Sequence, residues 1–285
     1  MTAPDQARLH VATSIDDAVA VLAEAGGAAT PIAGATWLMR APLRDEAMRP
    51  LYVALGRIEA LKGVEVAGGQ VSIGACVTHD ELARALAPLA DCRGLAVAAG
   101  TSANPAVRAT ATVGGNLATA DFAAADLVPA LLASDANVEL AGPSGTDRMP
   151  LDAFLAARAG LEPGCIVSRV IVPRTGRISA HARLPLRVAG DYPVAIVSLS
   201  VAIADGTVAD ARIAVGSVEP VARRWPGLEA ALAGRPLDAE AASRAAADCA
   251  HVFQGRDGVE ASGAYRVRVL PALVRRAVAA LADPI

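Results

Sequence analysis

The sequence predicts an α+β protein with two domains. At 285 residues the chain is long enough to bury more than one hydrophobic core. Its first forty residues have the pattern of a strand–helix–strand unit that runs into a glycine-containing turn. Beyond about residue 175, a long apolar β-hairpin is followed by three helical stretches. A hairpin followed by helices is typical of a separate α+β domain.

The first domain is predicted to alternate short strands and helices. A strand over 8–12 precedes a helix that Ser14 can cap and that the glycines at 26–27 end. Further strands are expected at 29–32, 51–55, 64–69, 70–76 and 164–174, a strand pair at 136–151, and helices at 78–86, 88–103 and 123–134.

In the second domain, the hairpin spans 193–218, and Asp205-Gly206 at its centre is a strong turn signal. The three helices are expected at 226–233, 238–253 and 264–282.

Composition excludes several classes of protein. The net charge of −3 gives no field for nucleic acid or an anionic membrane. No apolar run approaches the roughly eighteen residues of a membrane span, and the first ten residues contain no signal core, so we expect a cytoplasmic protein. The four cysteines form no CxxC pair, which argues against iron–sulfur or zinc sites. The four histidines, His10, His79, His181 and His251, are scattered, and a core, cap or surface role is expected for each.

Two glycine loops are the candidate binding features. The first is "PIAGATWL" (31–38) and the second is "TVGGN" (112–116), which leads into "LATADFAAADLVPALL". Backbone N–H groups in such turns can converge on an anion, and Thr36, Thr112 or Thr119 can add hydroxyl donors. Neither loop contains a lysine or the G-x-G-x-x-G pattern, so a P-loop NTPase and a Rossmann fold are not indicated. The residues alone leave two interpretations open, ordinary turns and a pyrophosphate-binding site.

Longer stretches carry a resemblance to a known family. They are "PIAGATWL" (31–38), "NPAVRATATVGGNLATADFAAADLVPALLASDANVEL" (104–140), "LEPGCIVSRVIVP" (161–173), "AHARLPLRVAGDYPVAIVSLSV" (180–201) and "GAYRVRVLPALVRRAVAAL" (263–281). In this order and over essentially the whole chain, the sequence resembles the FAD-binding medium subunit of the xanthine dehydrogenase / carbon monoxide dehydrogenase family of molybdenum hydroxylases.

The resemblance implies a two-lobed FAD-binding domain of the vanillyl-alcohol-oxidase/PCMH type over 1–174. An α+β C-terminal domain with an antiparallel sheet and helices would follow over 175–285. The positions that match the family's FAD contacts are Ile32, Ala33, Gly34, Ala35, Thr36, Trp37, Leu38, Thr112, Gly114, Gly115, Asn116, Thr119, Asp126, Ile166, Val167 and Arg183. Both glycine loops would hold the pyrophosphate. Arg183 and Arg187 match a Lys-x-x-x-Arg pair near the flavin edge, and neither catalytic nor metal-ligating residues are implied.

Three departures from the family pattern bear on the site. Ala35 replaces a common second glycine, which is a mild change provided that this residue needs no positive φ. Trp37 stands where a small or polar residue is more usual. Phe122 stands where a proline is frequent, and the stretch before Asp126 is one residue longer.

The function that the resemblance implies is electron transfer within an oxidoreductase complex. A large molybdopterin subunit would hydroxylate the substrate, a small subunit would carry two [2Fe–2S] clusters, and FAD on this chain would pass the electrons to an external acceptor. A dimer of heterotrimers is the expected assembly. Two alternatives remain open, a self-sufficient FAD-dependent oxidoreductase and a flavin-free assembly subunit of the same complex.

Overall fold

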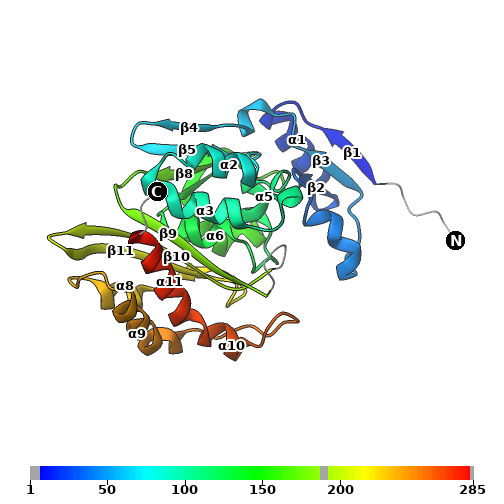
Figure 1. The fold of residues 1–285 in the computed structure, drawn as a ribbon. Helices are drawn as coiled ribbons and strands as arrows, with labels where there is room; N and C mark the ends of the chain where they lie inside the picture. The colour runs from blue at the N-terminus through cyan, green and yellow to red at the C-terminus, as the bar shows by residue number, and fades with distance from the viewer. Residues whose placement is uncertain (1–6, 187–191, 283–285) are drawn as a thin grey trace.

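The N-terminal lobe is a small parallel sheet with one helix (Figure 1). The computed structural model describes residues 7–186 and 192–282. The sheet has the order β1-β3-β2, and its strands are β1 (Arg8–Val11), β2 (Ala29–Ile32) and β3 (Leu51–Ala54). Helix α1 (Ile15–Ala25) joins β1 to β2, and its N-cap Ser14 accepts a hydrogen bond from the Asp17 amide at 3.1 Å. The predicted strand–helix–strand order and its cap are confirmed.

A five-stranded antiparallel sheet forms the middle lobe. Its order is β4-β5-β8-β6-β7, with β4 (Val64–Ala67), β5 (Gln70–Gly74), β6 (Asn137–Gly142), β7 (Gly145–Pro150) and β8 (Ile166–Pro173). Its helices are α2 (His79–Leu86), α3 (Arg93–Thr101), α4 (Pro105–Arg108), α5 (Val113–Ala118), α6 (Leu127–Ala133) and α7 (Leu151–Ala157). Leucines of α2, α3, α5 and α6 pack on valines and Ile73 of the sheet to form one core.

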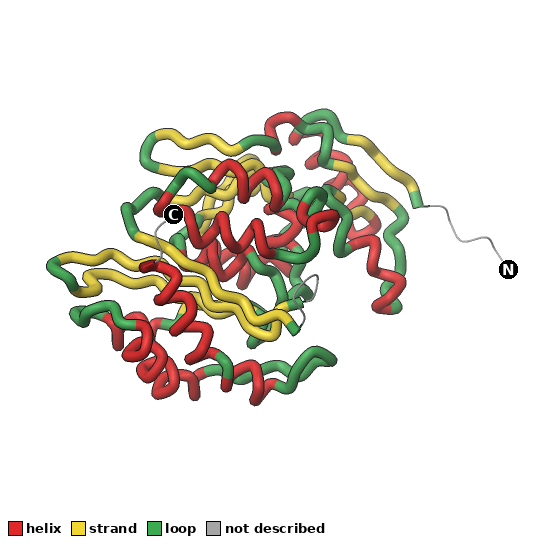
Figure 2. Tube along the Cα trace, viewed as in Figure 1, coloured by secondary structure: helices red, strands yellow, loops and turns green. Residues whose placement is uncertain are grey.

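The C-terminal lobe is a four-stranded antiparallel sheet with helices on both faces (Figure 2). Its order is β12-β11-β10-β9, with β9 (Ile178–Pro185), β10 (Pro193–Ala204), β11 (Thr207–Gly216) and β12 (Arg223–Arg224). One face packs against α3 and α6 of the middle lobe. The other face is covered by α8 (Pro226–Leu232), α9 (Ala239–Cys249), α10 (Gly263–Arg268) and α11 (Leu270–Ala282). The predicted hairpin is confirmed, with φ of 50° at Asp205 and 75° at Gly206.

Two predicted helices differ in detail, and one helix beside the second loop was not predicted. The helix expected over 123–134 begins only at Leu127, while 113–118 form α5, which the sequence did not predict. The Thr112 side chain caps α5 by accepting from the Gly115 amide, so the helix forms despite its two glycines. The helix expected over 264–282 divides at Val269 into α10 and α11. Pro271 lies in the first turn of α11, where its missing N–H costs no hydrogen bond.

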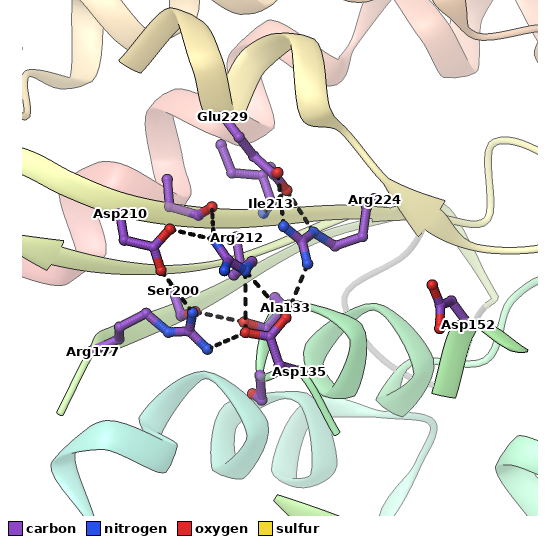
Figure 3. A network of polar contacts seen from close by, with 12 residues as sticks. Ala133, Asp135, Asp152, Arg177, Ser200, Asp210, Arg212, Ile213, Arg224 and Glu229 are labelled. Atoms are coloured by element: carbon purple, nitrogen blue, oxygen red, sulfur yellow. Dashed lines mark hydrogen bonds and ion pairs between the residues drawn. The ribbon is translucent and has the colours of Figure 1, made fainter. Parts of the chain in front are cut away.

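An ion-pair cluster ties the C-terminal lobe to the middle lobe (Figure 3). Asp135, directly after α6, has φ of 52° and accepts hydrogen bonds from Arg177 at 2.6 Å, Arg212 at 3.1 Å and Arg224 at 3.0 Å. Asp210 pairs with two of the same arginines, Arg177 and Arg212. The arginines belong to the four-stranded C-terminal sheet or lie next to it, whereas Asp135 belongs to the middle lobe. The Asp135 cluster, which consists of Asp135, Asp210 and the three arginines, therefore joins the two lobes.

Candidate functional site

Two cavities meet at the glycine loops. The first cavity, about 250 Å³, is bordered by the three lobes, and the second, about 920 Å³, extends between the N-terminal and middle lobes. Every residue that the family resemblance singles out lines one or the other. The ones at the first cavity are Ile32, Ala33, Gly34, Ala35, Thr36, Trp37, Leu38, Thr112, Gly115, Asn116, Thr119, Asp126 and Arg183, whereas Gly114, Ile166 and Val167 line the second. Arg187 lies outside the described residues.

The first loop (residues 33–37) holds unpaired backbone donors. Within the described chain, the amides of residues 34–37 donate to no backbone or side-chain acceptor. Ala35 has φ of 58°, in the left-handed region, and alternation of backbone hand turns successive N–H groups toward one point. These amides are half-buried, so either water or a bound anion can accept their hydrogen bonds. The first loop therefore has the features of an anion-binding nest.

Gly34 lets this loop approach the second one. A Cβ at Gly34 would lie 1.8 Å from the Thr110 carbonyl oxygen, just before the second loop (residues 112–116). Since two non-bonded heavy atoms pack at about 3.5–4.0 Å, no larger residue fits here without moving one loop. The close contact fixes the distance between the two loops.

Ala35 has a positive φ, which strains an alanine. Alanine in place of the family's glycine is therefore not a mild change at this position. A left-handed conformation costs a non-glycine residue about 1–2 kcal/mol. We predict that Ala35→Gly raises the free energy of unfolding by about 0.5–1 kcal/mol, because the relief of strain exceeds the added entropy of an unfolded glycine. Urea denaturation would measure it. Ala153→Gly, in helix α7, is the control and should lower stability by about 1 kcal/mol; a loss in both variants would contradict the prediction.

The second loop contributes differently. Its amides are engaged within the protein, since Val113 donates to the Val77 carbonyl at 2.9 Å and Gly114 to the Ala75 carbonyl at 2.8 Å. The Asn116 side chain accepts from the Leu127 amide at 3.3 Å, and the Thr119 hydroxyl donates to the Gly115 carbonyl at 2.7 Å. The second loop can therefore contact a ligand through its side chains and its packed backbone, but it does not form a second nest of free amides.

Asp126 and Arg183 form a buried ion pair in the wall of the first cavity. Their side chains are 7% and 11% exposed and lie 2.8 Å apart. Burial raises the pKa of the Asp126 carboxyl to about 6, although the Arg183 guanidinium draws it down. Despite the longer stretch before it, Asp126 lies in the same cavity as the first loop.

The raised pKa of Asp126 predicts a pH-dependent stability. Between about pH 4 and pH 6 the folded protein keeps a proton that the unfolded chain releases, so this group's stabilising contribution is lost as the pH rises. We expect the stability of the wild type relative to Asp126→Asn to fall over this range and then level off. Denaturation of both proteins at several pH values would measure it, and parallel pH curves would contradict it.

The second cavity supplies apolar walls. Ile166 and Val167, at the start of β8, are 4% and 7% exposed and line this cavity opposite the N-terminal lobe. Tyr52 and Arg158 line it as well. The cavity is large enough to take a planar ring system and its sugar, and it opens to the first cavity beside Trp37.

Sequence reasoning missed several residues of the first cavity, among them Tyr192, His79 and Ser102. Tyr192, from the C-terminal lobe, contacts Phe122, with ring centroids 5.3 Å apart. His79 and Ser102 also line the cavity and share a hydrogen bond of 2.7 Å. Burial lowers the pKa of His79 to about 4, so its ring is neutral at pH 7. The sequence lacks a local signal for these residues, because only the packing of distant segments brings them together.

The described residues contain neither a metal-ion cluster nor a membrane-spanning helix. No group of three or more His, Cys, Asp or Glu side chains in residues 7–186 and 192–282 is placed to hold a metal ion. Within the same ranges, no helix has the length and apolar character needed to cross a bilayer.

The fold and the site define a protein that can hold an elongated, anionic ligand across two cavities, with the charged group at the first loop. Residues 5–175 match the family model described as the FAD binding domain in molybdopterin dehydrogenase, and residues 181–281 match the CO dehydrogenase flavoprotein C-terminal domain. The chain therefore belongs to the FAD-binding flavoprotein subunits of the molybdopterin dehydrogenases, which are oxidoreductases.

Named relatives agree with this family. The chain is 28% identical over 279 residues to the carbon monoxide dehydrogenase medium chain of Hydrogenophaga pseudoflava, covering 96% of each protein. It is 32% identical to the 6-hydroxypseudooxynicotine dehydrogenase complex subunit alpha of Paenarthrobacter nicotinovorans, covering 94% of this chain and 92% of the relative. A solved carbon monoxide dehydrogenase from Hydrogenophaga pseudoflava superposes with a TM-score of 0.88 at 29% identity, covering 98% of both chains. The predicted fold class and family are confirmed, whereas the division at 174/175 and the site residues stay predictions.

Proposed function

We propose that this chain binds FAD across the two cavities and transfers electrons within a multi-subunit molybdenum hydroxylase. The proposed position of the FAD pyrophosphate rests on one observation: the unpaired amides of residues 34–37 lie where the two cavities meet. A pyrophosphate at this point would leave one end of the dinucleotide in each cavity. The residues present fit such a ligand, because Gly34 keeps the two loops close and, among the described residues, no protein acceptor pairs with the nest amides.

The flavin end is assigned to the first cavity. Arg183 and Tyr192 come from the C-terminal lobe and border only this cavity. The Asp126–Arg183 pair would fix the polar edge of the ring, and Ile166 and Val167 would hold the adenosine end by apolar contact in the second cavity. When bound, FAD supplies the redox chemistry, and the protein supplies position and electrostatics.

The partners follow from the family. Relatives are named as medium chains or subunits of dehydrogenase complexes, and one solved relative is a carbon monoxide dehydrogenase that lacks the Mo-pyranopterin moiety of its molybdenum cofactor. We propose a large molybdopterin subunit and a small [2Fe–2S] subunit as partners, in a dimer of heterotrimers in the cytoplasm. Electrons would pass from the small subunit's clusters through this chain to an external acceptor.

Purification and reconstitution test this proposal. We expect the chain to show a flavin absorbance spectrum, or to acquire one with added FAD, and to turn over no organic substrate until both partner subunits are added. Failure to bind FAD after reconstitution would favour the flavin-free assembly subunit, for which the strain at Ala35 is the specific observation. Turnover by the isolated chain would instead favour a self-sufficient oxidoreductase.

A further inference from the structure

Three aromatic rings and two guanidinium groups form a connected ladder beside the first loop. The Arg44 guanidinium lies 4.0 Å from the centroid of the Trp37 ring, and Trp37 contacts Phe122 with centroids 4.7 Å apart. Phe122 meets the Tyr192 ring edge-on at 5.3 Å. Arg40 closes the ladder, donating to the Tyr192 hydroxyl at 2.5 Å with its guanidinium 5.3 Å from that ring. We call these five residues the aromatic clasp.

The clasp joins three segments that are distant in the sequence. Trp37, Arg40 and Arg44 belong to the first loop and the 3₁₀ helix Leu38–Arg44 that follows it. Phe122 lies between Thr119 and Asp126, and Tyr192 immediately precedes β10. The chain has only three Phe, three Tyr and two Trp, so three of its eight aromatic rings are gathered here.

The clasp borders the junction of the two cavities. Its three rings and Arg40 line the first cavity, and Trp37 and Arg44 line the second. Trp37 is therefore the one ring of the clasp that borders both cavities, beside the nest of residues 34–37. A ligand that spans the two cavities would lie against Trp37, which the other members of the clasp hold in place.

We propose that the aromatic clasp is a gate for FAD exchange, an inference that rests on the proposed function. The contacts that hold the clasp closed are between protein side chains. The free energy needed to open it is therefore the same with and without the ligand. Entry and exit then share this cost. Weakening the clasp accelerates association and dissociation together and leaves the dissociation constant nearly unchanged, whereas loss of a direct ligand contact changes dissociation and affinity together.

Two substitutions weaken the clasp without emptying the cavity. Phe122→Leu keeps an apolar side chain but removes two ring–ring contacts, and Tyr192→Phe keeps the ring but removes the hydroxyl that Arg40 binds. We expect both rate constants to rise about tenfold in the first variant and roughly threefold in the second, from the usual strength of such contacts. The dissociation constant should stay within about threefold of the wild type.

Stopped-flow fluorescence of the full-length chain measures these rates. Association is followed by the change of flavin fluorescence on mixing with FAD, and dissociation by its reversal on dilution. Tyr265→Phe is the matched control, because Tyr265 also lies beside an arginine, Arg268 at 5.2 Å, but lines neither cavity.

The outcomes separate the gate from the proposed function. Parallel acceleration in both variants, absent from the control, supports the gate. Faster dissociation with a proportional loss of affinity would show that the clasp is a direct ligand contact, and unchanged rates would show that it is not on the path; either result overturns the gate while FAD binding stands. A wild-type chain that binds no FAD would overturn the proposed function itself.

Discussion

Gly34→Ala is expected to abolish retention of FAD. The new Cβ would lie 1.8 Å from the oxygen and 2.7 Å from the carbon of the Thr110 carbonyl, and both are backbone atoms that cannot rotate away. The loops must separate, which displaces the nest of residues 34–37 from the junction of the cavities. Overpacking typically costs about 1–3 kcal/mol, and because backbone atoms must move we expect the upper end, which lowers affinity roughly 100-fold if the loss falls on binding. The flavin-to-protein ratio after purification and an FAD titration would measure it.

Gly27→Ala is the matched control for this substitution. Gly27 has no positive φ, and a Cβ there would have no atom within 4 Å. It should retain FAD as the wild type does. Circular dichroism of Gly34→Ala would separate a displaced loop from a failure to fold. Normal FAD affinity in a folded Gly34→Ala protein would exclude the first loop as the pyrophosphate site.

The second large effect is expected at the junction of the lobes. Asp135→Asn keeps the size of the side chain and tolerates the left-handed φ of 52°, so it removes little besides the charge. Arg177, Arg212 and Arg224 then lose the carboxylate that all three contact. Arg177 is only 6% exposed, so water cannot readily replace the lost contact. Breaking a buried pair costs about 3–5 kcal/mol. Because the Asp135 side chain is 36% exposed, we expect the lower end, about 3 kcal/mol.

Urea denaturation of the whole chain would measure this loss. Asp147→Asn serves as the control, since the Asp147 carboxylate is exposed and accepts only from the adjacent Arg148 amide. Its effect should stay within about 0.5 kcal/mol. Equal stabilities of the two variants would mean that the Asp135 cluster contributes no net stability and that the other contacts between the lobes hold them together.

Local sequence signals predicted the features that local physics determines. Ser14 and Thr78 were correctly expected to begin helices, because a side-chain cap acts within one turn. Asp205-Gly206 correctly located the hairpin, since its two-residue turn requires positive φ at both positions. The glycine loops were recognisable from their local composition, and the family resemblance followed from the order of the motifs along the chain rather than from either loop alone.

Features that depend on distant segments were out of reach. Ala35 has a positive φ, and the adjacent Gly34 packs against Thr110, which lies far away in the sequence. Trp37 and Phe122 were noted as two unrelated departures, yet their rings contact each other at 4.7 Å. Tyr192 joins them only because β9, β10 and the middle lobe pack together. Contacts of this range leave no periodicity in the sequence.

The placement of the two tryptophans gives the molecule two separate optical reporters. Trp225 is fully buried in the C-terminal core against Phe253, with centroids 4.9 Å apart, whereas Trp37 borders both cavities. Indole emission is sensitive to the polarity and the acceptors around each ring, so the two report on different events. Emission from Trp37 reports what lies beside the glycine loops. Emission from Trp225 reports whether the C-terminal lobe is folded.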